Sequence, residues 1–181
     1  MKKIIKYLSI TFVLLFLVGC NMLNTPTSRV EEFLNSYRNH NSTVLNQLKE
    51  MVDMDSLMTE DQKNTYSDII KKQYKDLTYE IKDEVISGDT SVVTVEIEVY
   101  DYYKVNKQSE DYYNNNPSEF LSDTGKTSEQ KYVEYRLGKL SEATDRVRYT
   151  IDFNLTKVKD KWQLNEIDDA TRQKIHGLYN H

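Results

Sequence analysis

The sequence predicts an α+β domain in which N-terminal helices pack on a curved antiparallel sheet of about four long strands. Two observations lead to this prediction. Apolar residues recur every three or four positions over residues 28–74, as on one face of a helix. In two later stretches they recur at every second position, as in strands with one buried and one wet face. Helices followed by such strands are typical of α+β domains.

Three helices are predicted within residues 28–74. Ser28 and Glu31 have the spacing of a capping box and mark the start of the first helix. The polar stretch NHNST ends it, and Thr59 with Gln62 forms a second capping box that begins the third helix. The predicted inward faces are Val30, Phe33, Leu34 and Tyr37, then Val44, Leu45, Leu48, Met51 and Val52, then Tyr66, Ile69, Ile70 and Tyr74.

Two antiparallel hairpins follow. The first joins the alternating residues 77–85 and 93–99 through the turn SGDT. The second joins 147–155 to 162–167 through the turn VKDK, and the alternation slips near its end, which indicates a bulge. A last helix is predicted over about residues 169–179.

The segment between the hairpins, about residues 104–143, is predicted to be an insert. Its second half, SEQKYVEYRLGKLSEA, has helical spacing with Val133, Leu137 and Leu140 on one side. The stretch DYYNNNPSEF in its first half is too polar for a core segment and is predicted to be a loop displayed on the surface.

The first twenty residues have the layout of an export signal. Three lysines precede a mostly apolar run from Tyr7 to Val18, and the small residue Gly19 and the single cysteine, Cys20, follow it. A transmembrane helix needs about 20 apolar residues, so this run is too short to be one.

The residues Leu17-Val18-Gly19-Cys20 resemble the lipobox of bacterial lipoproteins. In that family the cysteine thiol receives a diacylglyceryl group and becomes the first mature residue. The resemblance implies a signal peptide over residues 1–19, a lipidated Cys20 with a tether to residue 27, and a domain over 28–181. It also implies that membrane lipid is a partner and that the domain lies on the extracytoplasmic face of the cell membrane. The alternative is an ordinary secretory signal with a cysteine near its end.

The order of the elements resembles the NTF2-like (cystatin-like) fold found in many small exported lipoproteins of Gram-positive bacteria. The stretch LTKVKDKWQLNEI is similar to the final hairpin of those domains, in which a strand, a charged turn and a strand beginning with tryptophan follow one another. The resemblance implies the fold for most of residues 28–181 but no activity. The insert departs from the simplest members, so no pocket shape is carried over.

Composition excludes several function classes. After removal of residues 1–19, 21 basic residues face 29 acidic ones, a net charge of −8. Nucleic-acid binding needs a basic surface, so nucleic acid is not an expected partner. With one cysteine in the chain, neither an intramolecular disulfide nor a metal site built on several thiolates can form. No cofactor motif and no metal-ligand spacing is present.

No catalytic motif stands out, so we expect a protein that is not an enzyme. Asp83 and Asp101 nevertheless fall on the inward side of their strands, where an unpaired carboxylate would be costly. Each therefore predicts a bulge, a sheet rim or a binding pocket. His176, next to Ile175 on the last helix, is predicted to cap or pack that helix. An Asp–His dyad, as in some enzymes with NTF2-like folds, is the alternative.

Tyrosines gather around the insert, among them Tyr103, Tyr112 and Tyr113, out of 14 in the chain. Their flat rings with polar tips suit packing, protein interfaces and sugar stacking alike. The favoured hypothesis is a lipid-anchored, non-catalytic domain that binds a protein, glycan or small ligand through the insert and the concave sheet. The alternatives are a structural accessory of a membrane complex and a small enzyme.

Overall fold

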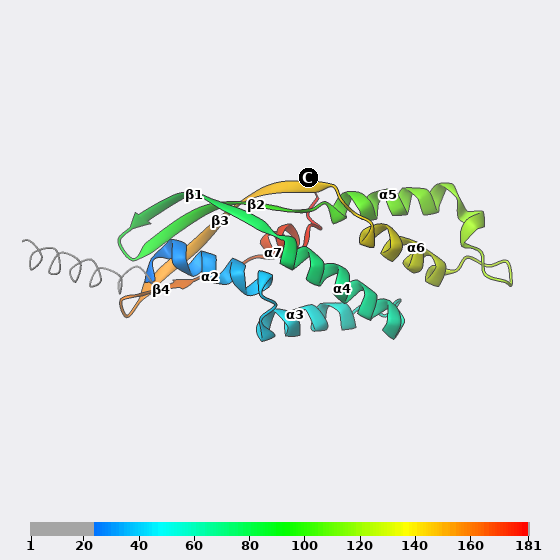
Figure 1. Ribbon diagram of the computed structural model, residues 1–181, viewed down its shortest axis with the longest axis horizontal. Helices are drawn as coiled ribbons and strands as arrows, with labels where there is room; N and C mark the ends of the chain where they lie inside the picture. Colours follow the sequence, from blue (N-terminus) through cyan, green and yellow to red (C-terminus); the bar gives the residue numbers. More distant parts are fainter. Residues whose placement is uncertain (1–23, 181) are drawn as a thin grey trace, which may run out of the picture.

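The computed structural model describes residues 24–180, which form helices packed on one antiparallel sheet (Figure 1). The elements in chain order are α2 (Pro26–Arg38), α3 (Ser42–Asp53), α4 (Glu60–Asp76), β1 (Thr78–Ser87), β2 (Thr90–Tyr100), α5 (Tyr102–Asn115), the 3-10 helix η2 (Pro117–Phe120), α6 (Glu129–Ser141), β3 (Arg146–Val158), β4 (Lys161–Leu164) and α7 (Asp169–His176). The four strands follow the order β1-β2-β3-β4. The predicted α+β class, with N-terminal helices and an antiparallel sheet, is confirmed.

The first helix begins earlier than predicted. Thr25, not Ser28, is its N-cap, and Ser28 is the third helical residue that completes the capping box. Pro26 occupies the first turn, where its missing N–H costs nothing. The predicted tether to residue 27 is therefore too long, because Pro26 and Thr27 are already helical. The carboxylate of Glu84 accepts hydrogen bonds from Thr27 N at 2.9 Å and Oγ1 at 2.6 Å, which ties this helix end to β1.

The second and third helices begin where polar caps predict them. Asn41 caps α3 by accepting from Val44 N, and Thr59 caps α4 in the predicted capping box with Gln62. The stretch NHNST does end α2, and His40 takes a positive φ of 51° at the break. The predicted inner faces are buried at Leu34, Leu48 and Ile70, among others.

The first hairpin has the predicted position. β1 and β2 pair from Thr78↔Glu98 to Ser87↔Thr90, and Gly88 supplies the positive φ of 60° that its two-residue turn requires. The register shifts between Ile81 and Asp83, which is a β-bulge. Beyond the bulge β1 lies at the sheet edge with exposed side chains, including Val85 and Ile86 at 57% and 52% exposure.

The second hairpin is shorter than predicted. β4 has four residues and ends at Leu164, and its turn uses positive φ at Lys159 and Asp160. Residues 165–168 are not a strand, because Asp168 turns the chain to cap α7 by accepting from Thr171 N at 2.7 Å. The last helix also ends sooner, at His176, where Gly177 at a φ of 70° closes it.

The insert is a helical hairpin that extends away from the sheet (Figure 1). α5 covers Tyr102–Asn115, so the first half of the insert is helical too, and the predicted surface loop is wrong over Asp111–Asn115. α6 begins at the cap Ser128 and carries the predicted buried face of Val133, Leu137 and Leu140.

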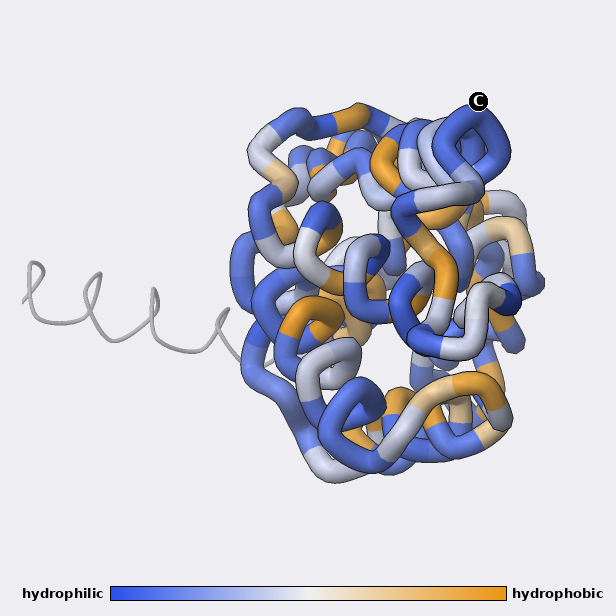
Figure 2. Tube along the Cα trace, turned by 90° about the vertical axis from the view of Figure 1, so that its right-hand side faces the viewer, coloured by the Kyte–Doolittle hydropathy of each residue, from blue (hydrophilic) through white to orange (hydrophobic). Residues whose placement is uncertain are grey.

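The inward face of the sheet is a filled core. Val93, Val95, Ile97 and Val99 of β2 are all 0% exposed, and α2 and α7 lie under that face (Figure 1). Burying each such side chain contributes about 1.5–3 kcal/mol. Apolar segments alternate with hydrophilic ones along most of the trace (Figure 2), as expected for elements with one buried face. The predicted binding face on the concave sheet is therefore occupied by packing.

The outer face of the sheet carries charges of both signs. Glu98 pairs with Arg146 at 3.2 Å and with Arg148 at 3.0 Å, and Lys82 pairs with Glu80 at 2.7 Å and Glu96 at 3.4 Å. Exposed pairs of this kind add little stability, and their effect is to keep the face hydrated. Of the helices within residues 24–180, none has the length and apolar character needed to cross a bilayer.

A buried amide joins the helices to the end of β2. Gln73, 0% exposed, accepts from Tyr100 N at 2.8 Å and donates to Tyr100 O at 3.2 Å. Gly177 lies against the same carbonyl, because residues 177 and 178 close α7 in a Schellman motif with bonds to Lys174 and Gln173. Tyr103 N then donates to Gly177 O at 2.7 Å.

Replacing Gly177 with Ala is expected to lower the free energy of unfolding by roughly 2–4 kcal/mol. A Cβ there would overlap Tyr100 O and Gln73 Nε2, and the positive φ strains any other L-residue. Urea denaturation followed by circular dichroism measures the change.

The matched control is Gly138→Ala, because a Cβ at this position on α6 meets no atom within 4 Å. This variant should gain about 0.5–1 kcal/mol through helix propensity. Equal effects of the two substitutions would show that the contact at Gly177 is unimportant.

Candidate functional site

The two aspartates singled out in the strands have different roles. Asp83 lies at the bulge of β1, is exposed, and accepts a hydrogen bond from Glu84 N at 2.9 Å. The bulge is one of the three predicted explanations, and it turns the carboxylate to solvent. A pocket acid at Asp83 is therefore not what the structure shows.

Asp101 is buried, at 6% exposure, but it caps a helix. Its Oδ1 accepts from Lys104 N at 2.9 Å at the start of α5, and its backbone N donates to Asp145 O at 2.9 Å. A carboxylate at a helix N-terminus is stabilised by the backbone N–H groups there. Asp101 therefore lies at the rim of the sheet, directly after the end of β2, which is one of the predicted explanations, and a helix cap offsets the cost of its burial.

The tyrosines of the insert pack mainly on one another. Tyr113 contacts Tyr132 with ring centroids 4.7 Å apart and Phe120 at 5.0 Å. Tyr112 stacks on Tyr135 at 5.0 Å with an interplanar angle of 15°. These contacts hold α5 against α6, so these tyrosines pack the insert on itself and not onto the sheet. Tyr112 also donates to Glu119 at 2.9 Å, which raises its pKa.

One side of this aromatic cluster borders a cleft of about 430 Å³ at the base of the hairpin. We call it the hairpin cleft. Its lining combines aliphatic, aromatic, hydroxyl, amide and charged groups: Lys104, Val105, Gln108, Ser109, Tyr112, Tyr135, Lys139, Glu142, Ala143, Thr144 and Asp145. Tyr112 lines it, whereas Tyr113 and Tyr103 are not among these residues.

The charges around the hairpin cleft balance. Lys104 pairs with Asp145 at 2.7 Å, and Lys139 pairs with Glu142 at 3.5 Å while lying 5.6 Å from the Tyr135 ring centroid. Two cations and two anions give the lining no net charge. Such a lining suits a neutral ligand with many hydrogen-bond donors and acceptors and one apolar face.

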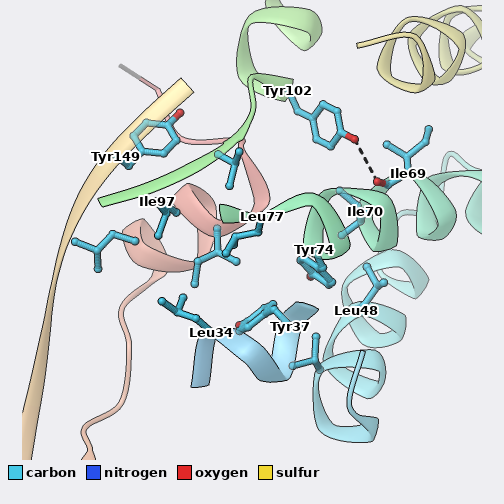
Figure 3. Packing of buried hydrophobic residues seen from close by; sticks show 14 of the residues in the cluster. Leu34, Tyr37, Leu48, Ile69, Ile70, Tyr74, Leu77, Ile97, Tyr102 and Tyr149 are labelled. Atoms are coloured by element: carbon cyan, nitrogen blue, oxygen red, sulfur yellow. Dashed lines mark hydrogen bonds between the residues drawn. The ribbon is translucent and has the colours of Figure 1, made fainter. Parts of the chain in front are cut away.

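His176 lies at a second cavity, of about 320 Å³, bordered by α2, α3, α4 and α7. We call it the His176 cavity, and it is lined by Tyr37, Gln47, Leu48, Met51, Tyr74, Arg172 and His176. The Tyr74 hydroxyl and His176 Nε2 share a hydrogen bond of 2.9 Å. Figure 3 shows Tyr37, Tyr74 and Leu48 next to one another in the helical layer. The hydrogen-bond partner of His176 is thus Tyr74 and not one of the two aspartates of the alternative Asp–His dyad. Asp83 lies at the bulge of β1, and Asp101 caps α5.

Burial controls the protonation of this pair. Loss of solvent, with a smaller contribution from the Arg172 charge, lowers the pKa of His176 to about 4. Burial also raises the pKa of the Tyr74 hydroxyl well above its ordinary value. Both side chains are neutral at pH 7, and they form a neutral hydrogen bond. Within residues 24–180, no group of three or more His, Cys, Asp or Glu side chains is arranged to hold a metal ion.

Comparison with known proteins adds little information about the function of this chain. No family model matches the chain, and no curated protein matches it. Among solved structures, the chain is similar to a candidate lipoprotein, ycdA, from Bacillus subtilis, with 17% sequence identity and a TM-score of 0.46. The match covers 78% of this chain and 47% of that chain, so the chain spans about half of that protein's length. At this TM-score the likeness carries no inference about function.

Sequence reasoning missed most of the hairpin cleft. Val105, Ser109 and Tyr112 have the spacing i, i+4, i+7 and share one face of α5. That spacing was visible in the sequence, but it is informative only once the first half of the insert is interpreted as a helix. Of the residues that line the His176 cavity, Met51 was predicted only as part of the inward face of its helix, and nothing in the sequence pointed to Arg172.

His176 predicts a stability that depends on pH. Its pKa is about 4 in the folded chain and about 6.5 when unfolded, so the unfolded state binds more protons between these values. The free energy of unfolding should therefore fall as the pH drops from about 6.5 to about 4, by up to about 3 kcal/mol.

Chemical denaturation of wild type and His176→Gln across this pH range measures the effect. Glutamine keeps a hydrogen-bonding group near Tyr74 but does not titrate, so the variant should lose stability less steeply toward acid. Parallel pH curves for the two proteins would contradict the role assigned to His176.

Proposed function

We propose that the protein is a lipid-anchored, extracytoplasmic binding domain without catalytic activity. Two features support the anchor: the lipobox-like residues 17–20 with Cys20, which lie outside the described residues, and the short distance in sequence from Cys20 to α2, whose N-cap is Thr25. Two acyl chains suffice for stable attachment to a bilayer. The order of helices, strand meander and Trp162 hairpin supports a relation to NTF2-like domains, from which the α5–α6 hairpin departs.

The observation that carries the binding function is the hairpin cleft. It is the place where side chains from α5, α6 and the segment before β3 leave a cavity large enough for a small ligand, about 430 Å³. Its lining has no net charge and contains the Ser109 and Thr144 hydroxyls, the Gln108 amide and two tyrosine rings. We propose a saccharide unit of an extracellular glycan as the ligand class, because such rings combine many hydroxyls with an apolar face.

A second candidate function, a structural accessory of a membrane complex, is favoured by the turn between α3 and α4. Met54 is 82% exposed and Leu57 is 49% exposed there. Exposed apolar side chains of this kind suit contact with another protein. The hairpin cleft has no part in such a role.

The anchor predicts a covalent modification. Mass spectrometry of the native protein from membranes should find Cys20 at the N-terminus and carrying a diacylglyceryl group. A free thiol on Cys20, or an intact N-terminal segment 1–19 in the native material, would contradict the anchor and the proposed location.

Tyr112 and Tyr113 provide a matched pair for testing the hairpin cleft. Both are on α5 and both contact Phe120, but only Tyr112 lines the cleft. A glycan array probed with the detergent-solubilised protein should identify a bound saccharide. Its affinity should fall about tenfold or more in Tyr112→Ala, equivalent to about 1.4 kcal/mol.

The control variant Tyr113→Ala loses similar aromatic packing and should keep the affinity within about threefold. An array without any saccharide bound above background, or equal losses in the two variants, would contradict glycan binding in the cleft.

A further inference from the structure

The His176 cavity has apolar walls on most of its surface. Leu48 is 2% exposed and Tyr74 is 1% exposed, and both border the cavity together with Met51. Tyr37 packs edge-on against Tyr74 with ring centroids 5.0 Å apart, which fixes both rings. The two tyrosine rings therefore form a rigid part of the wall. The Met51 side chain forms another part, which is flexible.

The charge at this cavity is positive. Arg172 is the one charged side chain among the described residues that line it. Its ion-pair partners, Asp169 at 2.7 Å and Glu166 at 3.5 Å, are about 90% exposed and lie in solvent, and neither lines the cavity. The Arg172 charge also acts on the pKa of both Tyr37 and His176, so the guanidinium lies close to the inner groups.

Two inner polar groups border the cavity. The Tyr37 side chain is 4% exposed and lines the cavity. Its hydroxyl is not among the buried side-chain atoms without a partner in the part of the chain that the structure describes, which are Ser91 Oγ, Asn106 Oδ1 and Arg136 Nε. His176 uses Nε2 for Tyr74. A tyrosine hydroxyl at the wall of a cavity can donate a hydrogen bond to a ligand or water there.

We propose that the His176 cavity binds a small carboxylate with an apolar tail. The carboxylate accepts hydrogen bonds from Arg172 at the mouth and from the Tyr37 hydroxyl, while the tail lies against Leu48 and Met51. Neutral His176 adds no charge and keeps the inner end of the cavity compatible with an apolar ligand. This site is separate from the hairpin cleft and does not depend on glycan binding there.

Hexanoate is a suitable probe for this site. Hexanol and hexylammonium have the same six-carbon tail but a neutral and a positive head group, so they test whether the negative charge is needed. The full chain, labelled with ¹³C at its methionine methyl groups and kept in detergent, reports the binding by NMR. Met51 lines the cavity, and Met54, 82% exposed, serves as an internal control for contact with detergent-borne probe.

The expected result is a saturable shift of the Met51 methyl signal with hexanoate and at least fivefold weaker binding of the other two probes. Arg172→Gln should weaken hexanoate binding about tenfold or more, since it removes a charge-assisted hydrogen bond. Tyr37→Phe should weaken it by a smaller factor. Arg148→Gln, which removes the same charge from the outer sheet face, and Tyr112→Ala in the hairpin cleft should leave it unchanged.

Three outcomes would overturn the proposal. They are the absence of a Met51 shift, equal binding of hexanol and hexanoate, and full hexanoate binding by Arg172→Gln. Equal shifts at Met51 and Met54 would also count against it, because they show probe in the detergent and none in the cavity.

Discussion

The side-chain amide of Gln73 bonds both backbone polar groups of Tyr100, and much of the structure depends on this contact. β2 ends at Tyr100, and an end of strand inside a protein leaves backbone groups that need partners. Gln73, from α4, supplies them without water. Because the chain is held there, Asp101 can turn it directly into α5, and Gly177 can bring the end of α7 against the same carbonyl. Arg146 closes the junction from β3 by donating to the carbonyl oxygens of Asp76 and Glu98.

This junction divides the molecule into parts with different tasks. The inward side of the sheet is filled with buried valine, isoleucine and phenylalanine side chains. The hairpin cleft and the His176 cavity lie instead between helices. One lies at the base of the α5–α6 hairpin and is balanced in charge, and the other lies among α2, α3, α4 and α7 and is positive. The core positions both cavities, and its residues Tyr37, Leu48 and Tyr74 form part of the wall of the second.

Local patterns predicted the elements whose signals lie within a few residues. The capping box at Thr59, the alternation through Val93–Val99 and the glycine of the first turn all have the predicted roles. Predictions were wrong where the deciding partner is distant in sequence. Ser28 has the right spacing for an N-cap, but Thr25 caps the helix, because Pro26 and the Glu84 carboxylate favour an earlier start. The role of Asp101 depends on where β2 ends, which Gln73 determines from 27 residues away. The first half of the insert was not predicted to be helical because its sequence is polar. The aromatic residues that α5 packs against are on α6, and the local sequence of α5 does not show this contact.

The bulge at Asp83 has a consequence for the behaviour of the protein at high concentration. β1 is long, lies at the edge of the sheet, and exposes Val85 and Ile86 near its end. A flat strand of this kind would offer its free backbone groups to another molecule and start aggregation. The extra residue at the bulge twists the strand, and the charged side chains of Lys82 and Glu84 flank it. Copies of the protein at high concentration can therefore remain separate, although each has an unpaired strand edge.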